Sequence, residues 1–284
     1  MCEFQDDGTG RRFEAGRVVR RSTVSRMSDA ADAERGAVKE ELPFGAAELL
    51  AAVAGAGRVL DLGCGSGRLT VALARAGAAV TGIDTSRERL EQARRRAGEC
   101  DVELQLVEAD MNEPLPFEDG SFDAATSRVA LMVAAAPAAT LRELRRVVMP
   151  DGRIATVIWA SPDQNPWFSA PRAAIAAVLG GERASFARAF GKLGDPAEAA
   201  DVHRAAGLRD VEATLLREHA PAADAAEHWE RLARENGHFR RVAETLTEAD
   251  RDAVVAEVAA RLEPYGTAGS LQVPRTLVLV TARR

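Results

Sequence analysis

The sequence predicts an α/β protein built on a parallel sheet, and three observations carry this prediction. Between residues 58 and 159, short apolar strands alternate with amphipathic helices at the spacing of βαβ units. Glycines at positions 63, 65 and 67 follow the first strand directly, where the chain turns into a helix. The 284 residues are 46% hydrophobic and 28% charged, which fits one large globular domain or two small ones.

The expected elements alternate regularly up to Trp159 and irregularly after it. Strands are expected over residues 58–62, 78–84, 102–107, 122–127 and 153–159, and helices over 46–53, 69–76, 86–98 and 140–148. Beyond Trp159 the sequence predicts helix over 160–206, a strand over 211–216, helix over 221–263 and a last strand over 273–281. We therefore expect a core over 37–159, completed by strands within 207–220 and 267–284, with helical insertions over 160–206 and 221–266 that cap the carboxyl edge of the sheet.

Composition narrows the possible partners and the cellular location. Residues 1–36 lack periodicity and the apolar stretch of a signal peptide, so we expect a flexible N-terminal arm outside the core. A net charge of −6 offers no overall attraction to nucleic acid, and no apolar run reaches the ~20 residues of a membrane span. The cysteines Cys2, Cys64 and Cys100 suit neither a disulfide framework nor a zinc site. We expect a cytoplasmic monomer or homodimer without nucleic-acid or membrane partners.

The segment Val59-Leu-Asp-Leu-Gly-Cys-Gly-Ser-Gly67 carries the most information about function. Glycine serves where the backbone adopts positive φ or approaches a ligand, so the alternate glycines leave a bare corner at a helix N-terminus. Ligands of open parallel sheets bind at the carboxyl ends of strands, and the next strand ends in Asp84, whose carboxylate can hold both hydroxyls of a ribose. A dinucleotide fingerprint needs its third glycine at position 68, which is Arg68. The residues therefore favour another nucleoside cofactor and leave the dinucleotide as the rival.

Four motifs in register resemble those of the class I S-adenosylmethionine-dependent methyltransferases. They are Asp61-Leu-Gly-Cys-Gly-Ser-Gly67, Gly82-Ile-Asp84, Ala109-Asp-Met111, and Leu141-Arg-Glu-Leu followed by Pro150-Asp-Gly152. Their order is similar to the small-molecule branch of ubiquinone and menaquinone enzymes, and the match covers about residues 40–160. The resemblance implies a Rossmann-like, doubly wound, mostly parallel seven-stranded sheet, with the segment 273–281 as its antiparallel last strand.

The resemblance also implies which residues bind S-adenosylmethionine. They are Asp61, Gly63, Cys64, Gly65, Gly67, Asp84, Thr85, Asp110, Met111 and Ser127. The glycine corner would pass beneath the methionine and the ribose, the second-strand carboxylate would hold the ribose hydroxyls, and the segment 109–111 would line the adenine. The carboxylate at position 61 would orient the turn or reach the methionine amino group through water.

Methyl transfer from a sulfonium is an in-line displacement, which requires alignment and, for some acceptors, a base. After the fourth strand the sequence has neither a Pro-Pro-aromatic motif, as adenine-modifying enzymes have, nor acidic ligands for a divalent metal. We therefore expect a small organic acceptor and no metal. The catalytic candidates are Arg128 and, as the base, His238. The substrate-binding candidates are Arg128, Met132, Trp159, Trp167, Phe168 and Phe239, and Asn165 and Trp229 are further candidates for the pocket.

Three functions remain open from the sequence. The leading one is methyl transfer to O, N or C of a small organic acceptor in secondary metabolism, with S-adenosylmethionine as cofactor. The second is a non-methylating reaction, such as a cyclisation, in which the same cofactor serves as a scaffold, because a fold does not dictate a function. The third is an NAD(P)-dependent oxidoreductase, which would have to accommodate Arg68 beside a pyrophosphate.

Overall fold

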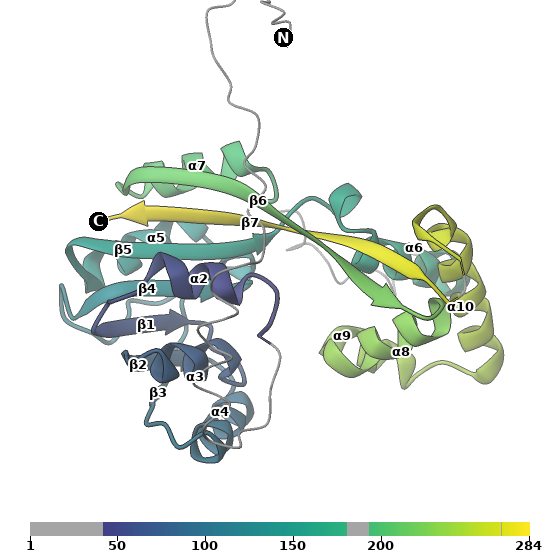
Figure 1. Ribbon diagram of the computed structural model, residues 1–284, viewed down its shortest axis with the longest axis horizontal. Coiled ribbons are helices and arrows are strands. Elements are labelled where there is room, and N and C mark those ends of the chain that lie inside the picture. The colour runs from purple at the N-terminus through teal and green to yellow at the C-terminus, as the bar shows by residue number, and fades with distance from the viewer. Residues whose placement is uncertain (1–41, 181–192, 268) are drawn as a thin grey trace, which may run out of the picture. The chain divides into compact units, whose positions relative to one another are not determined.

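The structure is a computed structural model that describes residues 42–180, 193–267 and 269–284. The arm expected over residues 1–36 lies outside the described residues. The segment Glu41–Arg284 forms one compact unit, and Figure 1 shows its elements in order along the chain.

The described residues form a seven-stranded sheet with the strand order β3-β2-β1-β4-β5-β7-β6. Its strands are β1 Arg58–Leu62, β2 Ala79–Asp84, β3 Gln105–Glu108, β4 Phe122–Arg128, β5 Val148–Trp159, β6 Arg209–Ala222 and β7 Leu271–Arg283. The first five strands pair in parallel, and β7 lies antiparallel between β5 and β6. The predicted doubly wound, Rossmann-like sheet with an antiparallel last strand is therefore confirmed. Strand order reverses between β1 and β4, which is the switch point where open α/β sheets bind ligands.

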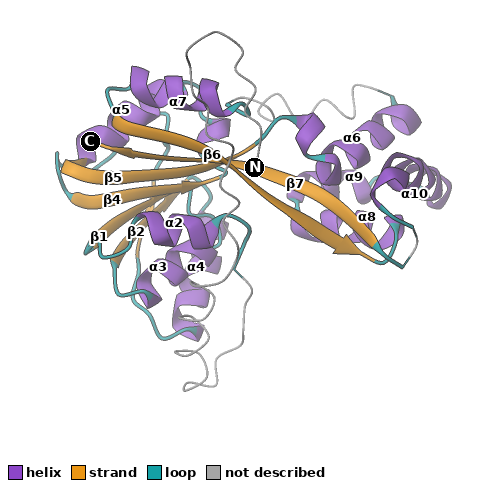
Figure 2. Ribbon diagram, turned by 45° about the horizontal axis from the view of Figure 1, so that its top comes forward, coloured by secondary structure: helices purple, strands orange, loops and turns teal. Residues whose placement is uncertain are grey.

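Helices cover both faces of this sheet, as Figure 2 shows. On one side lie α2 Ala46–Ala52, α3 Arg68–Arg75 and α4 Arg87–Glu99; on the other lie α5 Pro137–Val147 and α7 Pro196–Ala205. Side chains alternate along β1, so Val59 packs beneath α2 and α3, while Leu60 packs in the core that includes α5 and α7. These two cores fix the strand ends that form the site.

A third core lies beyond the end of β5. Strand β7 pairs with β5 only from Leu277 onward, and its first half pairs with β6 alone. This two-stranded extension carries the helices α6 Pro166–Leu179, α8 Ala225–Glu235, α9 Gly237–Ala243 and α10 Glu248–Leu262 (Figure 1). Leu271 and Val273 of β7 are buried with residues of these helices, which separates this core from the other two.

The insertions differ in detail from the sequence-based expectation. Helix α7 does not join the helices beyond β5 but contacts α5, β6 and β7, because Ala199 and its neighbours Ala206 and Leu208 are buried in the main core. Among the described residues of the first insertion, 160–180 and 193–206, α6 is therefore the helix that contributes to the helical cluster. The last two strands are longer than expected because their outer halves pair with each other without the rest of the sheet.

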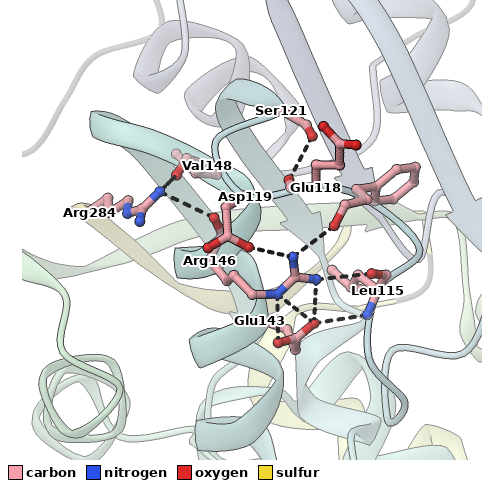
Figure 3. A network of polar contacts seen from close by, with 9 residues as sticks. Leu115, Glu118, Asp119, Ser121, Glu143, Arg146, Val148 and Arg284 are labelled. Atoms are coloured by element: carbon pink, nitrogen blue, oxygen red, sulfur yellow. Dashed lines mark hydrogen bonds and ion pairs between the residues drawn. The ribbon is translucent and has the colours of Figure 1, made fainter.

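Three short 3₁₀ turns, Leu131–Val133, Pro162–Gln164 and Glu263–Tyr265, connect these elements. The long connection between β3 and β4 is held by Arg146 of α5, whose surroundings Figure 3 shows. The Arg146 guanidinium donates to the backbone oxygens of Leu115 and Phe117, at 3.0 and 2.7 Å, and to the carboxylates of Glu143 and Asp119. Glu143 also accepts from the Leu115 backbone N–H at 2.9 Å. This network attaches the segment that follows β3 to helix α5.

Candidate functional site

The glycine corner between β1 and α3 adopts the conformation that the sequence predicts. Gly63, Gly65 and Gly67 have φ values of 71°, 55° and 80°, in the left-handed region that favours glycine. The backbone N–H of Cys64 donates to the Ile83 carbonyl at 2.9 Å, and the N–H of Gly67 donates to the Cys64 carbonyl at 3.0 Å. These bonds close the corner and attach it to the end of β2.

The three glycines face different surroundings. A Cβ on Gly63 would come within 2.2 Å of the Ala130 Cβ, and one on Gly67 within 2.7 Å of the Ala93 Cβ. A Cβ on Gly65 would meet only the tip of the Arg89 side chain, at 3.8 Å. Gly63 and Gly67 are therefore required for packing within the protein, whereas Gly65 borders open space that a ligand can enter.

Asp84 ends β2 directly beside this corner. Its Oδ2 accepts from the backbone N–H of Gly65 at 2.9 Å, and its Oδ1 accepts from the backbone N–H of Ser86 at 2.9 Å. A carboxylate offers about four lone-pair positions, so both oxygens can accept a further hydrogen bond. The two backbone bonds thus hold the carboxylate in a fixed orientation with acceptor capacity to spare.

Asp61 lies beneath the corner and is 1% exposed. Its carboxylate accepts from the hydroxyls of Thr70 in α3, at 2.7 Å, and Thr126 in β4, at 3.0 Å. Burial raises the pKa of Asp61 to about 6, although the two hydroxyl groups and the nearby Arg128 oppose this shift. Asp61 therefore joins β1, α3 and β4, and these contacts support the role of orienting the turn.

Cys64 presents its backbone, not its thiol, to the open side of the corner. A Cβ on Gly82 of β2 would lie 2.9 Å from the Cys64 Sγ, so the thiol packs closely over this glycine. Burial raises the pKa of the Cys64 thiol, and the charges of Asp61 and Asp84 add to this effect. The thiol is therefore neutral and unreactive at physiological pH.

The segment after β3 comes to the same edge of the sheet. The backbone N–H of Ala109 donates to the Asp84 carbonyl at 3.2 Å, and the Met111 side chain reaches to 3.5 Å from the position of a Cβ on Gly63. The Oδ1 of Asp110 accepts from the backbone and the side chain of Asn112, at 2.9 and 2.8 Å. Asp110 and Met111 are thus brought beside the corner, and Thr85, which follows Asp84, is exposed there.

The end of β4 supplies Ser127 and Arg128. Ser127 is fully buried and its hydroxyl donates to the Leu62 carbonyl at 3.2 Å. Val129, which directly follows Arg128, has a φ of 59°, which is strained for a β-branched side chain. This turn places Ala130 against Gly63, so the ends of β1 and β4 are in direct contact.

Arg128 is a largely buried cation at this edge. Its Nε donates to the Phe44 carbonyl at 3.1 Å. Burial lowers the pKa of Arg128 to about 10, with Arg68 and Arg275 adding to the shift and Asp61 and Glu218 opposing it. The guanidinium therefore stays charged at neutral pH.

The predicted substrate-binding aromatics form a continuous row. Ring centroids are separated by 6.3 Å between Phe44 and Trp159, 4.9 Å between Trp159 and Trp167, and 5.9 Å between Trp167 and Phe168. Phe168 continues to Phe239 at 5.1 Å. The row leads from the end of β5 into the helical cluster; Phe44, Trp159 and Trp167 are half-buried, whereas Phe168 and Phe239 are buried.

Other candidates belong to the interior. Met132, Phe239 and Trp229 are almost fully buried, and their side chains pack in hydrophobic cores. Asn165 bridges the chain after β5 to β7, because its Oδ1 accepts from the Thr276 N–H at 2.7 Å. His238 belongs to α9, and its side chain lies outside the described residues.

The structure adds polar residues that no sequence motif indicated. His228 of α8 and Arg275 of β7 converge on Trp167, and Arg275 forms an ion pair with Glu218 of β6. They come from three elements that are distant in the sequence. Only the tertiary pairing of β6 with β7 places them together.

No group of three or more His, Cys, Asp or Glu side chains suited to a metal ion occurs within residues 42–180, 193–267 and 269–284. Within the same described segments, no helix is long and apolar enough to cross a membrane.

Residues 60–156 match the protein family described as "Methyltransferase domain". Among curated proteins, a ubiquinone biosynthesis O-methyltransferase of Alkalilimnicola ehrlichii is 36% identical over 125 residues, which are 44% of this chain and 47% of that protein. A demethylmenaquinone methyltransferase of Clavibacter sepedonicus is 45% identical over 106 residues, 37% of this chain and 42% of that protein. An uncharacterized protein of Mycobacterium tuberculosis is 39% identical over 126 residues, 43% and 46% of the two chains. The chain thus matches less than half the length of these relatives.

Solved structures with the same fold cover more of the chain. The YcgJ protein of Bacillus subtilis has a TM-score of 0.55 at 19% identity, covering 85% of this chain and 99% of that one. The [4+2]-cyclase SpnF has a TM-score of 0.51 at 21% identity, covering 84% and 80%. A phosphoethanolamine N-methyltransferase of Haemonchus contortus, solved with S-adenosyl-L-methionine, has a TM-score of 0.51 at 18% identity, covering 80% and 48%. These similarities extend the shared fold beyond the segment that the family matches.

Proposed function

We propose that residues 60–156, which match the family described as a methyltransferase domain, form a class I S-adenosylmethionine-dependent domain, and that the protein methylates O, N or C of a small organic acceptor in secondary metabolism. The observation that carries the proposal is the pairing of Gly65 with Asp84. The glycine leaves open space at the turn, and the carboxylate beside it is fixed by two backbone N–H groups.

The residues present fit S-adenosylmethionine. A side chain at position 65 would fill the space next to the corner, and the Asp84 carboxylate retains acceptor positions for two ribose hydroxyls. Asp110 and Met111, which lie beside the corner, would line the adenine. When bound, the cofactor would supply an activated methyl group on a sulfonium: a bond from the acceptor to the methyl carbon would form as the carbon–sulfur bond breaks, with S-adenosylhomocysteine as the leaving group and loss of a proton from the acceptor.

The protein's own contribution is alignment and electrostatics. The strained turn at Val129 fixes the end of β4 against Gly63, and the hydrogen bonds of Asp61 fix α3 against β4. Such preorganisation holds the reactants in one geometry, which is the main source of rate in a displacement that needs no protein nucleophile. Arg128 orients the acceptor, and His238 on α9 is the candidate base.

The names of two relatives favour an acceptor with an oxygenated ring. One acts in ubiquinone biosynthesis and the other on demethylmenaquinone. The aromatic row from Trp159 to Trp167 at the end of β5 suits a planar acceptor, because aromatic faces stack on rings.

Calorimetric titration of S-adenosylhomocysteine tests the proposal. We expect binding to the wild-type protein and at least a tenfold loss in Asp84→Ala, because two hydroxyl contacts to a charged acceptor disappear. The control is Asp201→Ala, which removes an exposed carboxylate on α7 and should bind as the wild type does. Absence of binding to the wild-type protein would contradict the proposal, and binding of NADH in its place would favour the oxidoreductase.

The cyclase SpnF shares the fold, which keeps a non-methylating reaction as the alternative. A mass-spectrometric screen of oxygenated aromatic acceptors distinguishes the two. Methyl transfer adds one methylene to the mass of the product and converts the cofactor to S-adenosylhomocysteine. A product without this gain, formed while the cofactor is conserved, would support the alternative.

A further inference from the structure

Arg128, the last residue of β4, is a largely buried cation without a direct counter-ion. Its Nε donates to the Phe44 carbonyl at 3.1 Å, and within the described residues its side chain makes no other hydrogen bond and no ion pair. By contrast, the half-buried Arg146 and Arg275 each form an ion pair with a glutamate. Because removing a charge from water is costly, buried cations are usually paired. The bare guanidinium therefore indicates an anion from outside the described chain.

The hydrogen bond of Nε leaves the far end of the Arg128 guanidinium for a ligand. Nη1 and Nη2 have no hydrogen-bond partner in the part of the chain that the structure describes. Neither belongs to the fully buried unpartnered atoms of these residues, so both keep accessible surface. Two parallel N–H groups of this kind match the two oxygens of a carboxylate. The Phe44 carbonyl also fixes the orientation of the guanidinium, which lowers the entropy lost on binding.

The charges around Arg128 do not replace the counter-ion. Two carboxylates, those of Asp61 and Glu218, attract it, and two guanidinium groups, those of Arg68 and Arg275, repel it. The carboxylate of Asp61 accepts from two threonine hydroxyls. That of Glu218 forms the ion pair with Arg275. Both carboxylates are thus engaged by other groups, and the charge of Arg128 is left for an anionic ligand.

Strand register places Arg128 beside the aromatic row. Arg128 pairs with Val157 of β5 and Trp159 follows two residues later, so the side chains of Arg128 and Trp159 leave the sheet on one face. The carbonyl that holds the guanidinium belongs to Phe44, whose ring centroid lies 6.3 Å from that of Trp159. Two residues earlier on β4 and on the same face, Thr126 binds the carboxylate beneath the glycine corner. Arg128 therefore lies between the corner and the half-buried rings of the row.

We propose that the methyl acceptor is a planar anion that carries a carboxylate, and that Arg128 binds this carboxylate through Nη1 and Nη2 while the acceptor ring packs against Trp159. Arg128 is then a substrate-binding residue that positions the acceptor. It takes no part in proton transfer, because a guanidinium keeps its protons at neutral pH. The proposal rests on the proposed function, because it names the substrate class of that same reaction.

Calorimetry with 4-hydroxybenzoate tests the proposal, with 4-hydroxybenzamide as a neutral comparison of nearly the same shape. Both are titrated into the full-length wild-type protein with and without saturating S-adenosylhomocysteine. We expect the benzoate to bind about tenfold or more tightly than the benzamide, because bidentate hydrogen bonds between ionised groups are the stronger ones. Equal affinities, or binding of neither compound, would overturn the proposal and leave the guanidinium to solvent.

Two variants of Arg128 and one matched control separate charge from packing. Arg128→Met removes the charge from a side chain of similar length, and should reduce the preference for the benzoate to about twofold or less. Arg128→Lys keeps the charge without the fork, and should retain a preference of about threefold. Arg153 of β5 is also half-buried and donates to a carbonyl, that of Ala54 at 2.8 Å, but lies where the pairing of β5 with β4 begins. Arg153→Met should therefore keep the full preference, whereas a full preference in Arg128→Met would contradict the proposal.

The methionine part of the cofactor also carries a carboxylate, and a further titration distinguishes this source. S-adenosylhomocysteine has this carboxylate, and 5′-methylthioadenosine lacks it. We expect Arg128→Met to bind both within about twofold of the wild type, because Arg128 serves the acceptor. A loss confined to S-adenosylhomocysteine would assign Arg128 to the cofactor and overturn the proposal. If both nucleosides bind more weakly, the corner is perturbed, and the two benzoic compounds in the wild type and in Arg128→Lys decide.

The two proposals fail separately. If S-adenosylhomocysteine does not bind the wild-type protein, the proposed function fails, while the titrations without it still support or overturn the anion site at Arg128. If it binds and the benzoate is not preferred, the anion site fails and the proposed function stands.

Discussion

The buried carboxylate of Asp61 gives a prediction whose size follows from the structure. Its pKa is raised from 3.8 to about 6, chiefly because burial removes the charged form from water. The folded protein therefore holds the Asp61 proton more tightly than the unfolded chain does. The resulting loss of stability is absent below pH 3.8 and complete above pH 6.

Between these limits the free energy of unfolding should fall as the pH rises. The gap between 3.8 and about 6 corresponds to about 3 kcal/mol for the fully ionised carboxylate at pH 8. At pH 5 the same linkage gives about 1.6 kcal/mol, because part of the folded population keeps the proton. Asp61 should therefore cost the protein about 1.4 kcal/mol more at pH 8 than at pH 5.

Asp61→Asn removes this charge and preserves the local contacts. An amide can accept from one threonine hydroxyl and donate to the other, so both Thr70 and Thr126 keep a partner. The stability of the variant relative to the wild type should rise by about 1.4 kcal/mol from pH 5 to pH 8. Urea unfolding of both proteins at the two pH values measures this difference, in which the titration of all other groups cancels.

The control is Ile175→Val, a mild change in a fully buried side chain without a titratable group, whose difference from the wild type should not change with pH. A stability deficit of Asp61→Asn that is equal at both pH values, or that grows toward pH 8, would refute the reasoning. It would mean that attraction to Arg128 outweighs burial, so that the ionised carboxylate stabilises the fold.

Two further predictions concern the corner and the opposite side of the sheet. Gly65→Ala should lower stability by about 1 kcal/mol, because φ is 55° with no steric clash, yet weaken S-adenosylhomocysteine binding at least tenfold in calorimetry. Gly67→Ala should lower the melting temperature far more, since its Cβ would lie 2.7 Å from that of Ala93; equal melting temperatures would contradict this distinction. Burial lowers the pKa of His203 to about 4, so the wild type should lose stability as the pH falls from 7.5 to 5. In urea unfolding, about 2 kcal/mol of this loss should be absent from His203→Gln. An equal loss in both proteins would mean that the ring is protonated in the folded state.

The cofactor half of the site was predictable because its determinants are local. The corner at 63–67 and the segment 109–111 directly follow parallel strands, and the acid at 84 is the last residue of one. Parallel strands bring their carboxyl ends to one edge, so strand order alone places these residues together. The sequence could not show which glycine packs against the protein and which borders a ligand, because close packing at Gly63 and open space at Gly65 require the same residue type.

The acceptor half was not predictable for the opposite reason. Trp167 and Arg275 come from a helix and a distant strand, and the long pairing of β6 with β7 beyond the sheet brings them together. Glu218 and Arg275 lie opposite each other in these strands and form a cross-strand ion pair, which only the register of β6 against β7 determines. Helix α7 was misplaced for the same reason, since nothing in its composition shows that its apolar side contacts α5.

This division has a consequence for specificity. Substitutions in the helical cluster change neither the glycine corner nor the strand ends that hold it, because this cluster has its own hydrophobic core. The helices α6, α8, α9 and α10 can therefore vary to suit different acceptors while the corner and Asp84 remain fixed by backbone hydrogen bonds. It follows that exchange of Trp167 on α6 should alter which acceptor binds, and leave the affinity for S-adenosylhomocysteine unchanged.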